Sequence, residues 1–188
     1  MLSIVHLEEI RGLLLQLPDL TGALESHDSR FFDMVKQWLV RSETALRNNR
    51  LPAAATVAAL RGTLIMADRG VIPAGIAFSG RATPRKIRDA SAADILRQAE
   101  GITAGAIRDD AARMAEGERL AQQIAAVAVR KGLVAGVAAA ASHGERLSRL
   151  WTAVQADPDI GAASTHLAGL VGQTNTLILL DRSLPSPV

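Results

Sequence analysis

The sequence predicts an all-α fold, and three observations indicate it. Apolar residues recur at spacings of three and four along most of the chain. Hairpin turn motifs are missing, and only residues 174–180 hint weakly at a strand. A stretch of about fifty residues, 91–141, lacks proline and is dominated by alanine. We therefore expect an antiparallel bundle of three N-terminal helices, a long alanine-rich helix that projects from it or bends back, and two return helices.

The composition restricts the kind of core and the cell compartment. Of the 188 residues, 48% are hydrophobic but only 3% are aromatic, so the core is aliphatic. The chain has no cysteine, which excludes disulfides and thiolate sites and agrees with a cytoplasmic location. Glu8 and Glu9 argue against a secretory signal, and Arg130 and Lys131 interrupt the longest apolar run. We thus expect no transmembrane segment.

Arginine supplies all but three of the 21 basic residues, and the net charge is +2. Guanidinium groups suit phosphate and carboxylate ligands, but a GC-rich genome would also raise arginine together with alanine. We favour the second explanation.

Residues 1–75 are expected to form the N-terminal bundle. The first helix covers about residues 3–17 and ends before Pro18, and a polar connection follows at residues 21–29. The second helix has the strongest amphipathic pattern, carried by Phe31, Phe32, Val35, Trp38, Leu39 and Leu46. The third helix opens at Pro52, and Gly70 is expected to terminate it.

The sequence predicts a basic linker at residues 76–90, because prolines and glycines interrupt any regular element there. Ser91 and Asp94 have the spacing of a capping box, which predicts that the long helix starts at Ser91. Exposed amides at a helix start favour anions. The candidate anion or nucleic-acid site therefore consists of Arg81, Arg85, Lys86, Arg88 and Ser91. The favoured alternative is that these charges belong to a solvated linker and bind no ligand.

The domain from 91 to 182 comprises the long helix and the C-terminal helices. A seven-residue repeat along the helix predicts a contact with another helix. Asp110, Gly117 and Lys131 fall at the matching positions and spoil a conventional coiled coil. Two G-x-x-x-G pairs would let helices approach closely, within the chain or between copies. The candidate interface consists of Gly101, Gly105, Ile107, Met114, Ala121, Ile124, Ala128, Gly132 and Gly136.

The remaining helices are shorter. We expect the long helix to break near residues 142–144 and an amphipathic helix to follow. Asp157 and Pro158 suit the start of one last helix, and residues 183–188 are expected to be a flexible tail.

No common catalytic motif occurs, and the four histidines share no metal-ligand spacing with carboxylates. We therefore expect no catalytic residues, no metal and no cofactor. The leading hypothesis is a non-enzymatic interaction protein that binds a protein partner or its own copy through the long helix. The alternative is an accessory nucleic-acid-binding subunit that contacts phosphates through Arg81–Arg88. Peripheral membrane association is a third, less favoured hypothesis.

Overall fold

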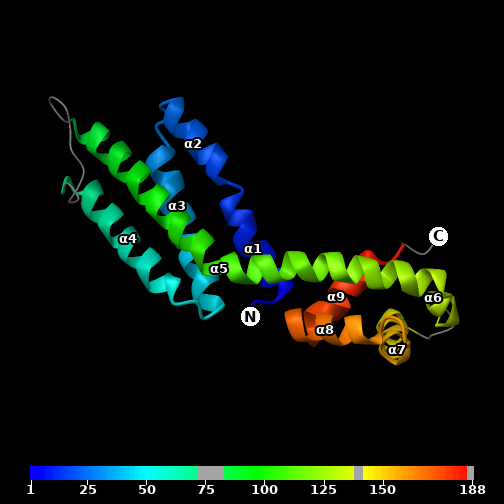
Figure 1. Ribbon diagram of the computed structural model, residues 1–188. Coiled ribbons are helices and arrows are strands. Elements are labelled where there is room, and N and C mark those ends of the chain that lie inside the picture. The colour runs from blue at the N-terminus through cyan, green and yellow to red at the C-terminus, as the bar shows by residue number, and fades with distance from the viewer. Residues whose placement is uncertain (72–82, 138–141, 186–188) are drawn as a thin grey trace. The chain divides into compact units, whose positions relative to one another are not determined.

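A computed structural model describes residues 1–71, 83–137 and 142–185 (Figure 1). The all-α prediction is confirmed, since the described residues form helices and no strand. The helices are α1 (Ile4–Leu14), α2 (Leu17–Glu25), α3 (Phe31–Asn48), α4 (Ala53–Asp68), α5 (Pro84–Arg130), α6 (Leu133–Gly136), α7 (His143–Ala156), α8 (Gly161–Val171) and α9 (Gln173–Ser183).

The chain divides into two compact units, and the division falls inside α5. The N-terminal unit consists of Leu2 and Ile4–Arg108, and the C-terminal unit consists of Met1, Ser3 and Asp109–Val188. The sequence had suggested a division at the linker 76–90 instead. The difference arises because residues 84–108 pack with α1–α4 through buried side chains such as Ile95 and Ala99.

In the N-terminal unit, α3 is the central helix and packs against α1, α2 and α4. Its apolar stripe is buried as the periodicity predicts, and Trp38 and Leu39 are completely inaccessible. The Trp38 indole Nε1 donates a hydrogen bond to the Leu13 carbonyl oxygen at 2.8 Å. Leu13 lies in the last turn of α1, and its carbonyl also accepts the Gln16 amide at 3.2 Å, so the indole adds a second hydrogen bond at this helix end.

A buried ion pair joins α3 to α4. Only 5% of the Glu43 side chain is exposed, and its carboxylate accepts a hydrogen bond from Arg61 Nε at 2.7 Å. Arg47, one turn further along α3, contacts the other carboxylate oxygen as the i,i+4 partner of Glu43. The hydrogen bond from Arg61, with the charges of both arginines, lowers the pKa of Glu43 below its ordinary value.

Three consecutive helices end in the same way. After α2, His27 N–H bonds the Leu24 carbonyl and Asp28 N–H bonds the Ala23 carbonyl, which is the Schellman pattern. Arg50 and Gly70 hold the equivalent positions after α3 and α4. All three residues have a positive φ, namely 55° at His27, 56° at Arg50 and 85° at Gly70. The prediction that Gly70 terminates its helix is confirmed.

Two sequence expectations for the N-terminal unit are wrong. The residues expected to form a polar connection, 21–29, largely belong to α2, which covers Leu17–Glu25. Pro18 lies in the first turn of α2 and does not simply stop α1. The physical reason is that proline lacks only an N–H that a first turn leaves unpaired in any case.

The start of α5 also differs from the expectation. The helix begins at Pro84, so residues 84–90 of the expected linker are helical. The Thr83 hydroxyl accepts a hydrogen bond from the Lys86 amide at 3.3 Å, and proline follows it at the first helical position. Ser91 is therefore not a cap. It lies inside the helix, fully buried, and its hydroxyl has no hydrogen-bond partner among the described residues.

The long helix is shorter at its other end than expected, because it stops at Arg130 and does not reach residue 141. Gly132 adopts a left-handed conformation with φ of 73°, which ends the helix, and α6 contributes one further turn. Ser142 does not mark a break inside a helix. It caps α7, and its hydroxyl accepts a hydrogen bond from the Glu145 amide at 3.2 Å. Residues 138–141 lie outside the described part of the chain.

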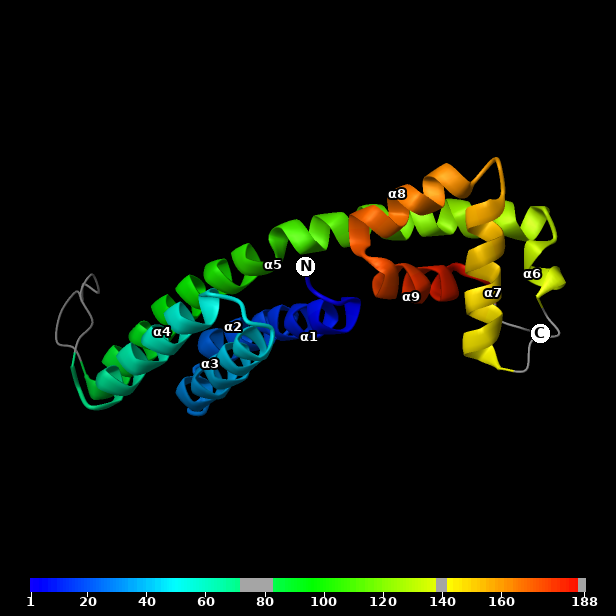
Figure 2. The ribbon, with the colours of Figure 1, turned by 90° about the horizontal axis from the view of Figure 1, so that it is seen from below.

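In the C-terminal unit, α8 and α9 pack against the C-terminal part of α5 at Gly117 (Figure 2). A methyl group added to Gly117 would lie 2.5 Å from Val171 Cγ1 and 3.3 Å from Leu179 Cδ1. Real Cβ atoms do not approach carbon that closely, so glycine is required for the contact.

The single last helix that the sequence suggested is two helices. Gly172, with φ of 79° and ψ of 154°, separates α8 from α9. Residues 174–180, the weak strand candidate, belong to α9. Ser183, the first residue of the expected tail, ends α9, while residues 186–188 lie outside the described part.

Asp157 stabilises the turn before α8, since its carboxylate accepts the Asp159 amide at 2.9 Å. The same carboxylate receives Lys131 Nζ at 2.7 Å from the turn that follows α5. This hydrogen bond raises the pKa of Lys131 and lowers that of Asp157. Within the described residues, no helix is both long enough and apolar enough to cross a bilayer.

Candidate functional site

The side of α5 that carries the seven-residue repeat faces inward. Five of the predicted interface residues are at most 3% exposed: Ile107, Met114, Ala121, Ile124 and Ala128. The helix contact that this repeat makes is thus with other helices of the same chain. A partner bound to α5 would have to use a different side of the helix.

Gly101 and Gly105 lie on an exposed side of α5 within the N-terminal unit. A Cβ atom added at either position would meet no described atom within 4 Å. The two glycines therefore do not serve a close approach between helices of the described chain. Each weakens the helix by about 1 kcal/mol relative to alanine, and packing within the unit does not require it.

The second glycine pair behaves differently. Gly132 is needed for the left-handed turn that ends α5, and Gly136 is the last residue of α6. Both are exposed, and neither has a described neighbour within 4 Å of an added Cβ. The structure therefore separates the two G-x-x-x-G pairs, because only Gly101 and Gly105 lie inside one continuous helix.

A groove runs beside this exposed side of α5, between the helix and α2. Most of its lining is apolar, and Arg97 and Glu100 add one positive and one negative charge. The lining residues are Leu17, Thr21, Leu24, Phe31, Ala93, Leu96, Arg97 and Glu100. Arg97 of this groove lies one turn before Gly101 on α5, and the groove residues together with Gly101 and Gly105 are here called the α5 exposed face.

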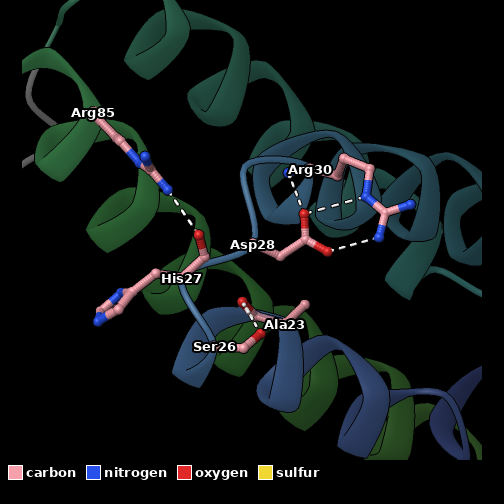
Figure 3. A network of polar contacts seen from close by, with 6 residues as sticks. All are labelled: Ala23, Ser26, His27, Asp28, Arg30 and Arg85. Carbon is pink, nitrogen blue, oxygen red and sulfur yellow. Dashed lines mark hydrogen bonds and ion pairs between the residues drawn. The ribbon is translucent and has the colours of Figure 1, made fainter.

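The basic cluster at the start of α5 is used largely for contacts within the unit. Figure 3 shows Arg85 reaching the turn between α2 and α3, where Nη2 donates to the His27 carbonyl oxygen at 2.8 Å. Arg85 Nε also lies 3.6 Å from a carboxylate oxygen of Asp89, one turn along. Arg85 thus ties the first turn of α5 to the end of α2.

The turn that Arg85 contacts is itself braced by an ion pair. Asp28 accepts the Arg30 backbone amide at 2.9 Å and makes a two-point contact with the Arg30 guanidinium (Figure 3). The side-chain hydrogen bonds from Arg30 lower the pKa of Asp28 to about 2. The carboxylate therefore remains ionised over the whole physiological range.

Arg88 lies on the inner side of α5. Its Nε is 3.1 Å from a carboxylate oxygen of Asp68, at the end of α4. Its guanidinium carbon lies 4.4 Å from the centre of the Phe32 ring, a cation–π contact. Lys86 is exposed, and Arg81 lies outside the described residues. Two arginines of the predicted anion site, Arg85 and Arg88, therefore already contact carboxylate or carbonyl oxygens of the same chain.

The sequence did not indicate a cavity of about 660 Å³ in the C-terminal unit. Charged and polar side chains from the start of α7 and the end of α9 meet there, namely His143, Arg146, Asp181 and Arg182. His143 Nε2 lies 3.0 Å from Asp181 Oδ1, and Arg146 Nη2 lies 2.8 Å from His143 Nδ1. Nothing in the local sequence could have shown this, because the two helix ends are far apart along the chain.

The described residues contain no group of three histidine or carboxylate side chains placed to hold a metal ion. Comparisons with protein-family models, with curated proteins and with solved structures found no match to this chain.

Proposed function

We propose that the protein is a non-enzymatic helical interaction protein. It binds a helix of a protein partner, or of a second copy of itself, on the α5 exposed face. The observation that carries this proposal is the pair of open glycines, Gly101 and Gly105, in the middle of a 47-residue helix.

The energetic argument starts from the instability that the glycines introduce. Together they weaken the helix by about 2 kcal/mol relative to two alanines, a large share of a typical domain's net stability. Within the described residues, no close packing at the two glycines offsets this loss. A second helix that crosses α5 closely at these positions would offset it, because the backbones can approach where side chains are missing.

The surroundings of the glycines suit such a partner. In the adjacent groove, Leu24 is partly exposed to an apolar side chain of a bound helix, while Leu17 and Leu96 form its buried floor. Glu100 can pair with a positive charge of the partner, whereas Arg97 already contacts Asp94 Oδ1 at 2.7 Å.

The experiment is the double substitution Gly101→Ala and Gly105→Ala. Because each added methyl group meets open space, the free energy of unfolding should rise by about 1–2 kcal/mol. The same methyl groups would separate the two helices of the complex, so binding should weaken about tenfold or more. Gly62→Ala in α4, also an open and exposed helix glycine, is the matched control.

Self-association is measured by sedimentation equilibrium. Partner binding is measured as retention of one defined lysate protein on the immobilised chain. Opposite effects on folding and on binding, restricted to the α5 variant, would support the proposal. Unchanged association together with increased stability would refute it.

Nucleic-acid binding through Arg81–Arg88 has weaker support. Arg85 and Arg88 already contact His27, Asp89 and Asp68, so phosphate binding would have to break these contacts. If bound RNA or DNA were found and Arg85→Glu removed it, this alternative would replace the proposal.

A further inference from the structure

The cavity in the C-terminal unit has an apolar part and a charged part. Val129, Val134, Ala135 and Leu184 belong to the apolar part, and Val129 is 43% exposed although it is a large aliphatic residue. The volume of about 660 Å³ lies within the range usual for small-molecule sites. Pockets of this kind are mostly apolar and use a few polar groups to orient a ligand.

The hydrogen bonds fix the state of the polar groups. Arg146 Nη2 can only donate, so His143 Nδ1, at 2.8 Å, must accept. The imidazole proton is therefore on Nε2, where it faces Asp181 Oδ1 at 3.0 Å. The order Arg146, His143, Asp181 is a directed chain that holds each of the three side chains in place.

Arg146 is the group of the cavity suited to an anion. Among the described lining residues, Arg146 and Arg182 are positively charged and Asp181 is negatively charged, and Arg182 already has an interaction partner. Arg146 uses one N–H on His143 and keeps further donors of its planar fork. Such a fork fits the two oxygens of a carboxylate.

We propose that this cavity binds a small organic monocarboxylate with an apolar body. The carboxylate lies on the Arg146 guanidinium, and the apolar body lies against Val129, Val134 and Ala135. The ligand carboxylate contacts Arg146 and not Asp181, whose carboxylate accepts the hydrogen bond from His143 Nε2. This binding site is independent of the proposed helix interaction.

The test uses three probes of equal chain length: octanoate, octanol and octylammonium. Binding to the full chain is followed by NMR, through the methyl signals of Val129 and Val134 and the ring signals of His143. Octanoate should shift these signals and saturate, while octanol should bind at least about tenfold more weakly because it lacks the charge-assisted hydrogen bonds. Octylammonium should not bind.

Two substitutions separate this site from nonspecific binding. Arg146→Gln should lower the affinity for octanoate about tenfold or more and leave the affinity for octanol unchanged. Arg149→Gln, which removes an exposed guanidinium of the same helix that pairs with Glu145 outside the cavity, should leave octanoate unchanged. Equal affinity for octanoate and octanol, no saturation by octanoate, or equal effects of the two substitutions would overturn the proposal.

Discussion

Among single residues, the glycines of α5 have opposite roles although they share one helix. Gly101 and Gly105 face open space, whereas Gly117 is buried under Val171 and Leu179. A methyl group is therefore tolerated at the first two positions and obstructed at the third. What decides the role of each glycine is its three-dimensional surroundings, since the local sequence is helical in every case.

Gly117→Ala is expected to lower the free energy of unfolding by about 1–3 kcal/mol, the usual effect of overpacking. The β-branched Val171 cannot turn away easily, because its rotamer is restricted in a helix. Gly105→Ala in the same helix is the control and should raise stability by about 1 kcal/mol. Urea unfolding followed by circular dichroism measures both, and a stabilising Gly117→Ala would show that α8 and α9 do not pack there.

His27 and Arg50 have left-handed backbone conformations. Such a conformation costs a residue with a side chain about 1–2 kcal/mol more than it costs glycine. His27→Gly and Arg50→Gly should each raise the melting temperature, with a gain in stability of about 1 kcal/mol. The Arg85 contact is kept in His27→Gly because it uses the backbone carbonyl. Gly70→Ala, at the equivalent position after α4, should have the opposite effect, and the same sign for all three would contradict this explanation.

Between elements, the Glu43 carboxylate of α3 makes a buried ion pair with Arg61 of α4. The pKa of Glu43 is lower in the folded chain than in the unfolded chain. Its contribution to stability is therefore fully present above the unfolded pKa, near pH 4.5. The contribution is lost as the pH falls through the lower, folded pKa.

Glu43→Gln should lower the free energy of unfolding at pH 7 by about 1–3 kcal/mol, since two arginines lose a charged acceptor. The difference from the parent chain should shrink as the pH is lowered below about 4.5, where the parent glutamate also becomes neutral. Urea unfolding at several pH values measures this difference in the free energy of unfolding. Glu116→Gln, at an exposed position of α5, is the control, and a difference that does not change with pH would contradict the link.

The sequence was sufficient for elements whose amphipathic pattern is strong or whose ends carry specific residues. The stripe from Phe31 to Leu46 gave α3, and Pro52 and Gly70 delimited α4 closely. Two other prolines were expected to interrupt helices although each lies at the start of one. Pro18 and Pro84 both lie in a first turn, and the hydroxyl of Thr83 was not recognised as the cap.

The candidate sites were less predictable than the fold. The periodicity of Ile107, Met114 and Ala121 predicted a helix contact, and all three are buried, but a repeat cannot show whether the other helix belongs to the same chain. The cluster of Arg85 and Arg88 indicated positive charge, but its carboxylate and carbonyl partners lie on other helices. Long-range partners of this kind are fixed by tertiary packing.

For the whole molecule, each compact unit has its own core and contains one of the two tryptophans. Trp38 is buried in the N-terminal unit and Trp151 in the C-terminal unit. The two indole N–H signals in a urea titration followed by NMR therefore report the two units separately. Because the cores are distinct, we expect different midpoints.

The substitutions above sharpen this expectation. Gly117→Ala should lower the Trp151 midpoint and leave the Trp38 midpoint nearly unchanged, whereas Glu43→Gln should do the reverse. Equal shifts of both signals in both variants would mean that the chain unfolds as a single cooperative unit.

The proposed interaction is tested most directly by a crosslink from the α5 exposed face. The chain has no cysteine, so Gly101→Cys provides a single thiol for a photoactivated crosslinker, and Gly62→Cys provides a control on α4. Illumination of the labelled chain, alone and in lysate, is followed by mass spectrometry of the adducts. The account predicts one specific adduct from position 101, with a second copy or a single partner protein, and none from position 62. No adduct from position 101, or the same adducts from both positions, would contradict it.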